Sequence, residues 1–310
     1  MTMIDLSTER RPAPATRSRA ARYDRTTRRA PWLLALPACV LCFGLLLVPS
    51  LFGAGYAFTD WDGITSAHWV GLANFHELVG QRDGTAVLTH TVVLALAYVL
   101  GVNVAGLGLA LALQNTLKTR ALLRGLFFVP VVVSPLVVSY IWKFMLDSQG
   151  SINDLLADVG LAGLRQPWLG QPQTALACIV VVMIWQYAGY HMLIYTAGLQ
   201  GVQGELHEAA AVDGARSWRR FRDITLPLLR PTITISLTLS TITALTVFDQ
   251  VMALTAGGPA GSTDTLGTYV YEQAFVNGRY GYSAAVAVVL VVFVALVAVV
   301  QVRALRSRGR

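Results

Sequence analysis

Residues 205 to 227 read Glu-Leu-His-Glu-Ala-Ala-Ala-Val-Asp-Gly-Ala-Arg-Ser-Trp-Arg-Arg-Phe-Arg-Asp-Ile-Thr-Leu-Pro, a polar and basic island between two long apolar segments. Ala209 and Ala210, which follow Glu208, give a helix face with very small side chains. Such a face can enter a narrow groove. Gly214 permits a backbone bend that residues with a Cβ atom resist. The island therefore predicts a backbone bend at Gly214, in a polar segment between two apolar helices.

The chain around this island is apolar enough for a membrane protein. Its residues are 55% hydrophobic and only 13% charged, which is typical of a polytopic membrane protein and not of a soluble domain. A span needs about 20 helical residues, and lipid offers no partners to an open backbone. We therefore predict an all-α fold with six transmembrane helices, near residues 32–58, 87–113, 122–146, 174–198, 231–255 and 284–303.

Prolines add detail to this prediction. Pro130 and Pro135 lie inside the third predicted span and imply a kink that neighbouring helices must accommodate. Pro227 and Pro231 suit the first turn of a helix, so the fifth span should begin near them.

Basic residues fix the expected orientation. Eight arginines lie between Arg10 and Arg29, and further basic residues lie near Lys118, in the 205–227 island and in the tail. The positive-inside rule then places both termini and the island in the cytoplasm. We expect a disordered basic arm over 1–30, a transmembrane domain over 31–304 and a cytoplasmic tail over 305–310. The net charge of +7 reflects orientation and contacts with lipid headgroups, and does not indicate nucleic-acid binding.

The island resembles the EAA loop of ABC importer permeases, in Glu208-Ala209-Ala210, Gly214 and Ile224-Thr225-Leu226-Pro227 at fixed offsets. This resemblance implies a short helix, a glycine turn and a second short helix. The alternative is an ordinary surface helix whose basic residues meet lipid headgroups. Several other segments are similar to permeases of maltose-type and glycerol-phosphate-type carbohydrate importers, among them Val70-Gly71-Leu72-Ala73-Asn74-Phe75 and Leu254-Thr255-Ala256-Gly257-Gly258-Pro259. The second of these points to the first of the two permeases in such a transporter. The resemblance extends from about residue 30 to the end.

This resemblance implies a type I ABC importer permease in the bacterial plasma (inner) membrane, and a sugar or sugar derivative as its cargo. It implies as partners a homologous second permease, two ABC ATPase subunits and an extracytoplasmic sugar-binding protein, all in membrane lipid. The residues expected to couple to the ATPase are Glu208, Ala209, Ala210, Gly214, Ile224, Leu226 and Pro227.

The chain itself is not expected to be an enzyme. It contains no Gly-x-x-x-x-Gly-Lys-Ser/Thr motif, so ATP hydrolysis would fall to a partner. Neither a cofactor nor a metal site is indicated, since Cys39, Cys42 and Cys178 all lie in apolar segments.

A polar and aromatic cluster marks the middle of the fourth predicted span. Gln186, Tyr187 and Tyr190 occupy neighbouring helix surface, and such groups at mid-depth should face the bundle or a wet cavity. In the family, substrate contacts come from this helix and the next one, where Ser240 and Thr243 lie. These five residues are candidates for the substrate path. The alternative is that they only form hydrogen bonds between helices.

The main functional alternative is a secondary transporter or channel subunit that is not coupled to an ATPase. It predicts charged sites at mid-membrane or repeat symmetry, and the sequence shows neither. A membrane enzyme would need paired carboxylates or a nucleophile with a base, whereas only isolated histidines such as His90 and His191 are available.

Overall fold

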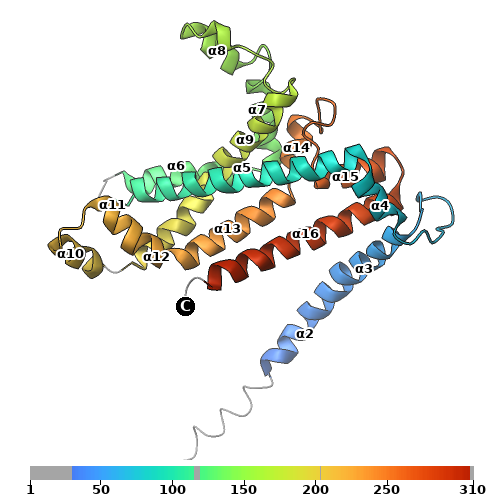
Figure 1. Ribbon diagram of the computed structural model, residues 1–310, viewed down its shortest axis with the longest axis horizontal. Coiled ribbons are helices and arrows are strands. Elements are labelled where there is room, and N and C mark those ends of the chain that lie inside the picture. Colours follow the sequence, from blue (N-terminus) through green and yellow to red (C-terminus); the bar gives the residue numbers. More distant parts are fainter. Residues whose placement is uncertain (1–29, 115–118, 203, 308–310) are drawn as a thin grey trace, which may run out of the picture. The chain divides into compact units, whose positions relative to one another are not determined.

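The computed structural model describes residues 30–114, 119–202 and 204–307 (Figure 1). Over these residues the structure is helical, and its β structure is limited to an isolated antiparallel bridge between Thr59 and Trp69. The predicted all-α fold class is therefore confirmed for this part of the chain. The arm predicted over 1–30, except its last residue, and residues 308–310 of the tail lie outside the described residues.

The described part of the chain divides into two units, one that ends at Gly53 and one that begins at Ala54. Helix α2 (Ala30–Cys42) continues through a π-helical turn, η1 (Phe43–Leu47), into α3 (Val48–Gly55), and the boundary between the units falls inside α3. Ser50 Oγ donates a hydrogen bond to the carbonyl oxygen of Leu46 at 2.6 Å, which satisfies its hydroxyl inside an apolar helix.

The second unit contains the remaining elements. They are η2 (Tyr56–Phe58), α4 (Ala73–Gly80), α5 (Arg82–Ala112), α6 (Arg120–Val132), α7 (Pro135–Met145), α8 (Ser151–Asp158), η3 (Ala162–Leu164), α9 (Pro172–Gln200), α10 (Gly204–Val212), α11 (Ser217–Arg220), η4 (Phe221–Thr225), α12 (Leu226–Leu228), α13 (Arg230–Leu245), α14 (Asp249–Leu254), α15 (Leu266–Tyr271), η5 (Glu272–Val276) and α16 (Tyr280–Ser307).

Within the described residues, four helical stretches are long and apolar enough to cross a membrane: Ala35–Phe58, Arg82–Ala112, Pro172–Gln200 and Tyr280–Ala304. Two bent pairs raise the number to as many as six if each pair counts as one span. The first pair, α6 and α7, bends by 96° between Pro130 and Pro135. This bend lies where the prolines predicted a kink.

The fifth predicted span differs from the structure. A single helix was expected over 231–255, whereas α13 ends at Leu245 and α14 begins at Asp249. The break exposes backbone groups that a helix would have satisfied. Thr265 compensates by donating its Oγ hydrogen to the Val247 carbonyl at 3.2 Å. The second bent pair consists instead of Ser217–Leu228 and Arg230–Leu245, which meet at 70°.

Close helix packing builds the core of the second unit. Helix α5 packs against α9 and α13, α6 packs against α9, and α13 also packs against α16. Glycines allow two of these approaches. A Cβ atom on Gly106 of α5 would lie 2.7 Å from the His191 Cβ, and one on Gly189 of α9 would collide with the Phe127 carbonyl. Small residues of this kind let helix backbones approach closely in membrane proteins.

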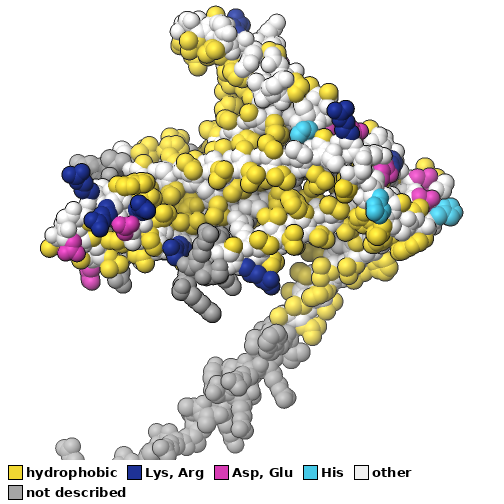
Figure 2. Space-filling view, in the orientation of Figure 1, with side chains coloured by type: hydrophobic (Ala, Val, Ile, Leu, Met, Phe, Trp, Pro, Cys, Tyr) yellow, Lys and Arg dark blue, Asp and Glu magenta, His cyan; other side chains and the backbone are white. Residues whose placement is uncertain are grey.

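Charged side chains of the described residues lie mainly at the ends of the long helices and in the segments between them. On the face that Figure 2 shows, Lys, Arg, Asp and Glu side chains lie near helix ends, and the surface between them is mostly hydrophobic. This distribution fits helices whose middle turns contact hydrocarbon and whose ends contact headgroups and water.

Candidate functional site

The 205–227 island forms the helix, turn and helix that its sequence predicts. Helix α10 ends at Val212, and Gly214 has a φ of +74°. The Gly214 N–H donates to the Ala211 carbonyl at 3.1 Å, and the Ala215 N–H donates to the Ala210 carbonyl at 2.9 Å. These two bonds are those of a Schellman cap, in which a residue with positive φ ends the helix. Glycine therefore fixes the direction in which the chain leaves α10.

The surface of this island exposes apolar side chains. Glu208 and Ala209 are exposed, and Val212 and Trp218 are 89% and 72% exposed. Exposed apolar groups mark an interaction surface where they form a contiguous patch, and these two side chains are available for one. Three other residues expected to couple to the ATPase lie between this surface and α13 in the chain. Ile224 lies in η4, and Leu226 and Pro227 lie in α12.

A buried polar network connects three helices in the core. Asn103 of α5 donates through Nδ2 to Ser240 Oγ of α13 at 2.9 Å. Its Oδ1 accepts from the Tyr195 hydroxyl of α9 at 2.7 Å and from Ser236 Oγ of α13 at 2.6 Å. Since the Ser236 proton points to Asn103, Ser236 Oγ accepts from His191 Nδ1, 2.7 Å away. This assignment follows from the donor and acceptor balance of the network.

A cavity of about 240 Å³ lies beside this network. Its lining combines aromatic rings with polar groups and comes from α5, α6, α9 and α13: Tyr98, Val131, Tyr187, Tyr190, His191, Leu239 and Thr243. The Tyr98 and Tyr187 rings meet edge to face with centroids 6.4 Å apart. The buried Tyr98 hydroxyl has no hydrogen-bond partner among the described residues. Such a group calls for a ligand or water.

Three of the five residues expected on the substrate path therefore line one cavity: Tyr187, Tyr190 and Thr243. The other two lie elsewhere. Ser240 belongs to the Asn103 network. Gln186 is fully buried; its Nε2 donates to the Val133 carbonyl at 3.2 Å, and its Oε1 accepts from Gln250 at 3.3 Å.

Sequence reasoning missed Asn103, Tyr98 and Tyr195. A signal for Asn103 existed, because a polar amide deep inside an apolar span is a candidate functional or packing residue by default. Tyr98 and Tyr195 carry no such signal, since tyrosine is common in membrane helices and only its neighbours reveal its role.

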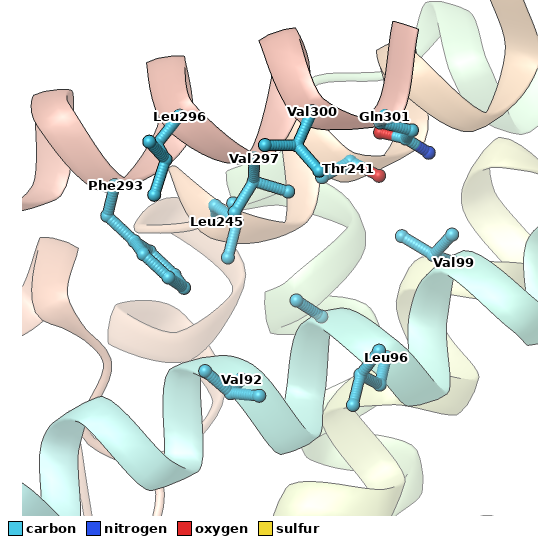
Figure 3. A pocket seen from close by; sticks show the side chains of 11 residues that line it. Val92, Leu96, Val99, Thr241, Leu245, Phe293, Leu296, Val297, Val300 and Gln301 are labelled. Atoms are coloured by element: carbon cyan, nitrogen blue, oxygen red, sulfur yellow. The ribbon is translucent and has the colours of Figure 1, made fainter. Parts of the chain in front are cut away.

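Two of the larger cavities among the described residues are almost entirely apolar. One of about 440 Å³ lies between α5, α13 and α16, where Thr241 and Gln301 are the polar residues of its wall (Figure 3). The other, of about 710 Å³, is lined by residues of α5, α6, α7 and α9. Walls of this kind suit acyl chains or a neighbouring helix better than a polar solute. Among the described residues there is no cluster of three His, Cys, Asp or Glu side chains that could hold a metal ion.

Comparison with known proteins identifies the family. Residues 103–309 match the family described as binding-protein-dependent transport system inner membrane component. The chain is 35% identical over 263 residues to the multiple sugar-binding transport system permease protein MsmF of Streptococcus mutans, covering 83% of this chain and 89% of MsmF. It is 33% identical over 258 residues to the trehalose/maltose transport system permease protein MalF of Thermococcus litoralis, covering 83% and 86%.

The fold is shared with a solved transporter. A chain from the crystal structure of a bacterial ABC transporter involved in the import of the acidic polysaccharide alginate superposes with a TM-score of 0.80 at 23% identity, covering 94% of this chain and 100% of that one. At this identity the likeness establishes the fold alone. With the family match over two thirds of its length, this chain belongs to the binding-protein-dependent transport system inner membrane components, which are transport permeases and not enzymes.

Proposed function

We propose that this chain is the sugar-carrying permease subunit of an ATP-driven importer, and that the 205–227 island couples it to an ATPase. One observation carries the proposal. The island is the direct connection between α9 and α13, and these two helices contribute Tyr187, Tyr190 and Thr243 to the cavity wall. Force applied to the island thus reaches the cavity through two helix ends.

The cavity suits a sugar. The faces of tyrosine rings pack against the carbon side of a sugar ring, and hydroxyl and imidazole groups bond to its hydroxyls. The permeases MsmF and MalF are named for the transport of multiple sugars and of trehalose and maltose, which supports the same class of cargo here.

A second permease would complete the path. The cavity is smaller than the roughly 300–1,000 Å³ of typical ligand pockets, so one chain supplies part of a site. A homologous permease facing the same cavity would supply the rest, and each bent helix pair would count as one of six spans. An extracytoplasmic binding protein would deliver the sugar.

In this scheme both termini and the island face the cytoplasm. The exposed Val212 and Trp218 side chains and the side-chain-poor surface at Ala209 would seat α10 in a groove of one of two ATPase subunits. ATP-driven approach of the ATPase subunits would pull the 205–227 island and the corresponding loop of the second permease together. The ends of α9 and α13 would follow and change the cavity's access from one side of the membrane to the other.

The test is reconstitution of the full chain in vesicles with its second permease, ATPase and binding protein. Uptake of labelled maltose and trehalose is then measured with and without ATP. We expect uptake to require ATP and the binding protein. Uptake driven by an ion or proton gradient without ATP would instead establish the secondary transporter.

A further inference from the structure

A second, smaller polar pocket lies at the ends of three helices. Its volume is about 150 Å³, and its polar lining comprises Gln114 after the end of α5, Arg120 and Arg124 at the start of α6, and Thr196 and Gln200 at the end of α9. Neither the substrate cavity nor the coupling island includes any of these side chains.

The pocket presents buried donors that lack partners. Thr196 is 7% exposed, and its Oγ1 is buried with no hydrogen-bond partner in the described part of the chain. Arg124 donates from Nη2 to the Leu113 carbonyl at 3.0 Å, but its buried Nε has no partner there either. Orphaned buried polar atoms are rare and require an explanation. A bound group with several acceptor atoms would satisfy both.

The charge of the pocket favours an anion. Two arginines line it, and no carboxylate does. The carboxyl ends of α5 and α9 oppose an anion through their partial negative charge of about half a unit each. Two full positive charges outweigh them, and Arg124 already caps the α5 end. Because guanidinium groups match phosphate oxygens in geometry and charge, we propose that this pocket binds a phosphate group.

The position of the pocket favours a lipid headgroup as the source. It lies at the ends of the candidate spans Arg82–Ala112 and Pro172–Gln200, where hydrocarbon gives way to headgroups. Basic pockets between helices at this depth are suited to anionic lipid. Gln200 also lies four residues before the start of α10, so a lipid bound here would hold the helix end from which the coupling island departs.

This inference goes beyond the proposed function, because it requires only that the chain is embedded in a bilayer. The test uses the purified full chain in nanodiscs, with retained lipid measured by native mass spectrometry. The probes are phosphatidylglycerol, monogalactosyldiacylglycerol as a lipid without phosphate, and inorganic phosphate. The variants are Arg120→Gln and Thr196→Val, with Arg82→Gln at the opposite end of α5 as the matched charge control.

We expect the wild type to retain phosphatidylglycerol in preference to the galactolipid. Arg120→Gln should weaken retention about tenfold, as loss of one charge-assisted bond implies, and Arg82→Gln should have no effect. Thr196→Val should also weaken retention. Its melting temperature without added lipid should not fall, since the change removes a hydroxyl that has no partner in the pocket.

Equal retention of both lipids by the wild type would overturn the proposal, and so would unchanged retention by both pocket variants. Inorganic phosphate separates the two sources. If phosphate alone binds to the lipid-depleted protein and displaces phosphatidylglycerol, the pocket is a phosphate site for a soluble ligand. If phosphate does not displace the lipid, the headgroup is its ligand.

Discussion

The turn at Gly214 allows a graded test of coupling. Gly214 has a φ of +74°, and a Cβ atom added there would meet nothing within 4 Å. The cost of a substitution is therefore conformational, with no steric clash to add. An ordinary L-residue pays about 1–2 kcal/mol in this region, a β-branched residue is a true outlier there, and asparagine is tolerated.

These costs predict the order of the variants. Gly214→Asn should be close to wild type, Gly214→Ala intermediate and Gly214→Val the most damaging. A penalty of about 2 kcal/mol lowers the ratio of bent to unbent turn about 30-fold, and loss of the bend misplaces the entire α10 contact. Glu208→Ala removes a single exposed side chain and should reduce coupling less than Gly214→Val.

The assay reconstitutes each variant with its ATPase and binding protein, and measures retention of the ATPase and sugar-stimulated ATP hydrolysis. The Asn variant controls for the loss of glycine as such. Full stimulation in both Gly214→Val and Glu208→Ala would show that residues 205 to 227 are not the coupling element. A severe defect in Gly214→Asn would refute the conformational explanation.

Three further predictions test the cavity, the network and the topology. Tyr190→Ala should reduce uptake with basal ATP hydrolysis retained, and Tyr190→Phe should reduce uptake less because the ring remains. Unchanged transport kinetics in the Ala variant would show that Tyr190 serves only in helix packing. Asn103→Leu leaves two buried hydroxyls without their acceptor and should lower the free energy of unfolding in detergent by about 1–3 kcal/mol. Tyr195→Phe removes a donor instead and should lower it less. An equal or larger decrease for Tyr195→Phe contradicts this reasoning. In intact cells an impermeant thiol reagent should label a cysteine at Ser262 and not one at Ser217, and the reverse pattern would invert the orientation.

Local chemistry explains what the sequence could predict. A glycine cap, a proline bend and an apolar run each act within a few residues, and the structure has the Gly214 turn and the 96° bend between Pro130 and Pro135. Neither feature depends on a distant segment. Helical spacing also places Tyr187 and Tyr190 on neighbouring surface of α9, but the cavity that they line is completed by the distant helices α5, α6 and α13.

The features that sequence reasoning missed depend on distant partners. Asn103 bonds to residues 92, 133 and 137 positions away, and no local pattern encodes those encounters. The break after Leu245 has the same origin, since Thr265 satisfies the Val247 carbonyl from a later segment. Gln186 shares a helix with Tyr187, yet one step around the helix places it against Val133 and Gln250 and away from the cavity.

The Asn103 network also bears on how motion could pass through the chain. All four hydrogen-bonding positions of this amide are in use, toward Val99, Ser240, Tyr195 and Ser236. If α9 slid past α13, this network would lose bonds in a low-dielectric core, where an unpaired polar group is costly. Rotation of α5, α9 and α13 as one body would keep every bond. We therefore expect a force on the island to rock these helices together, so that access to the cavity changes chiefly where they face a second subunit.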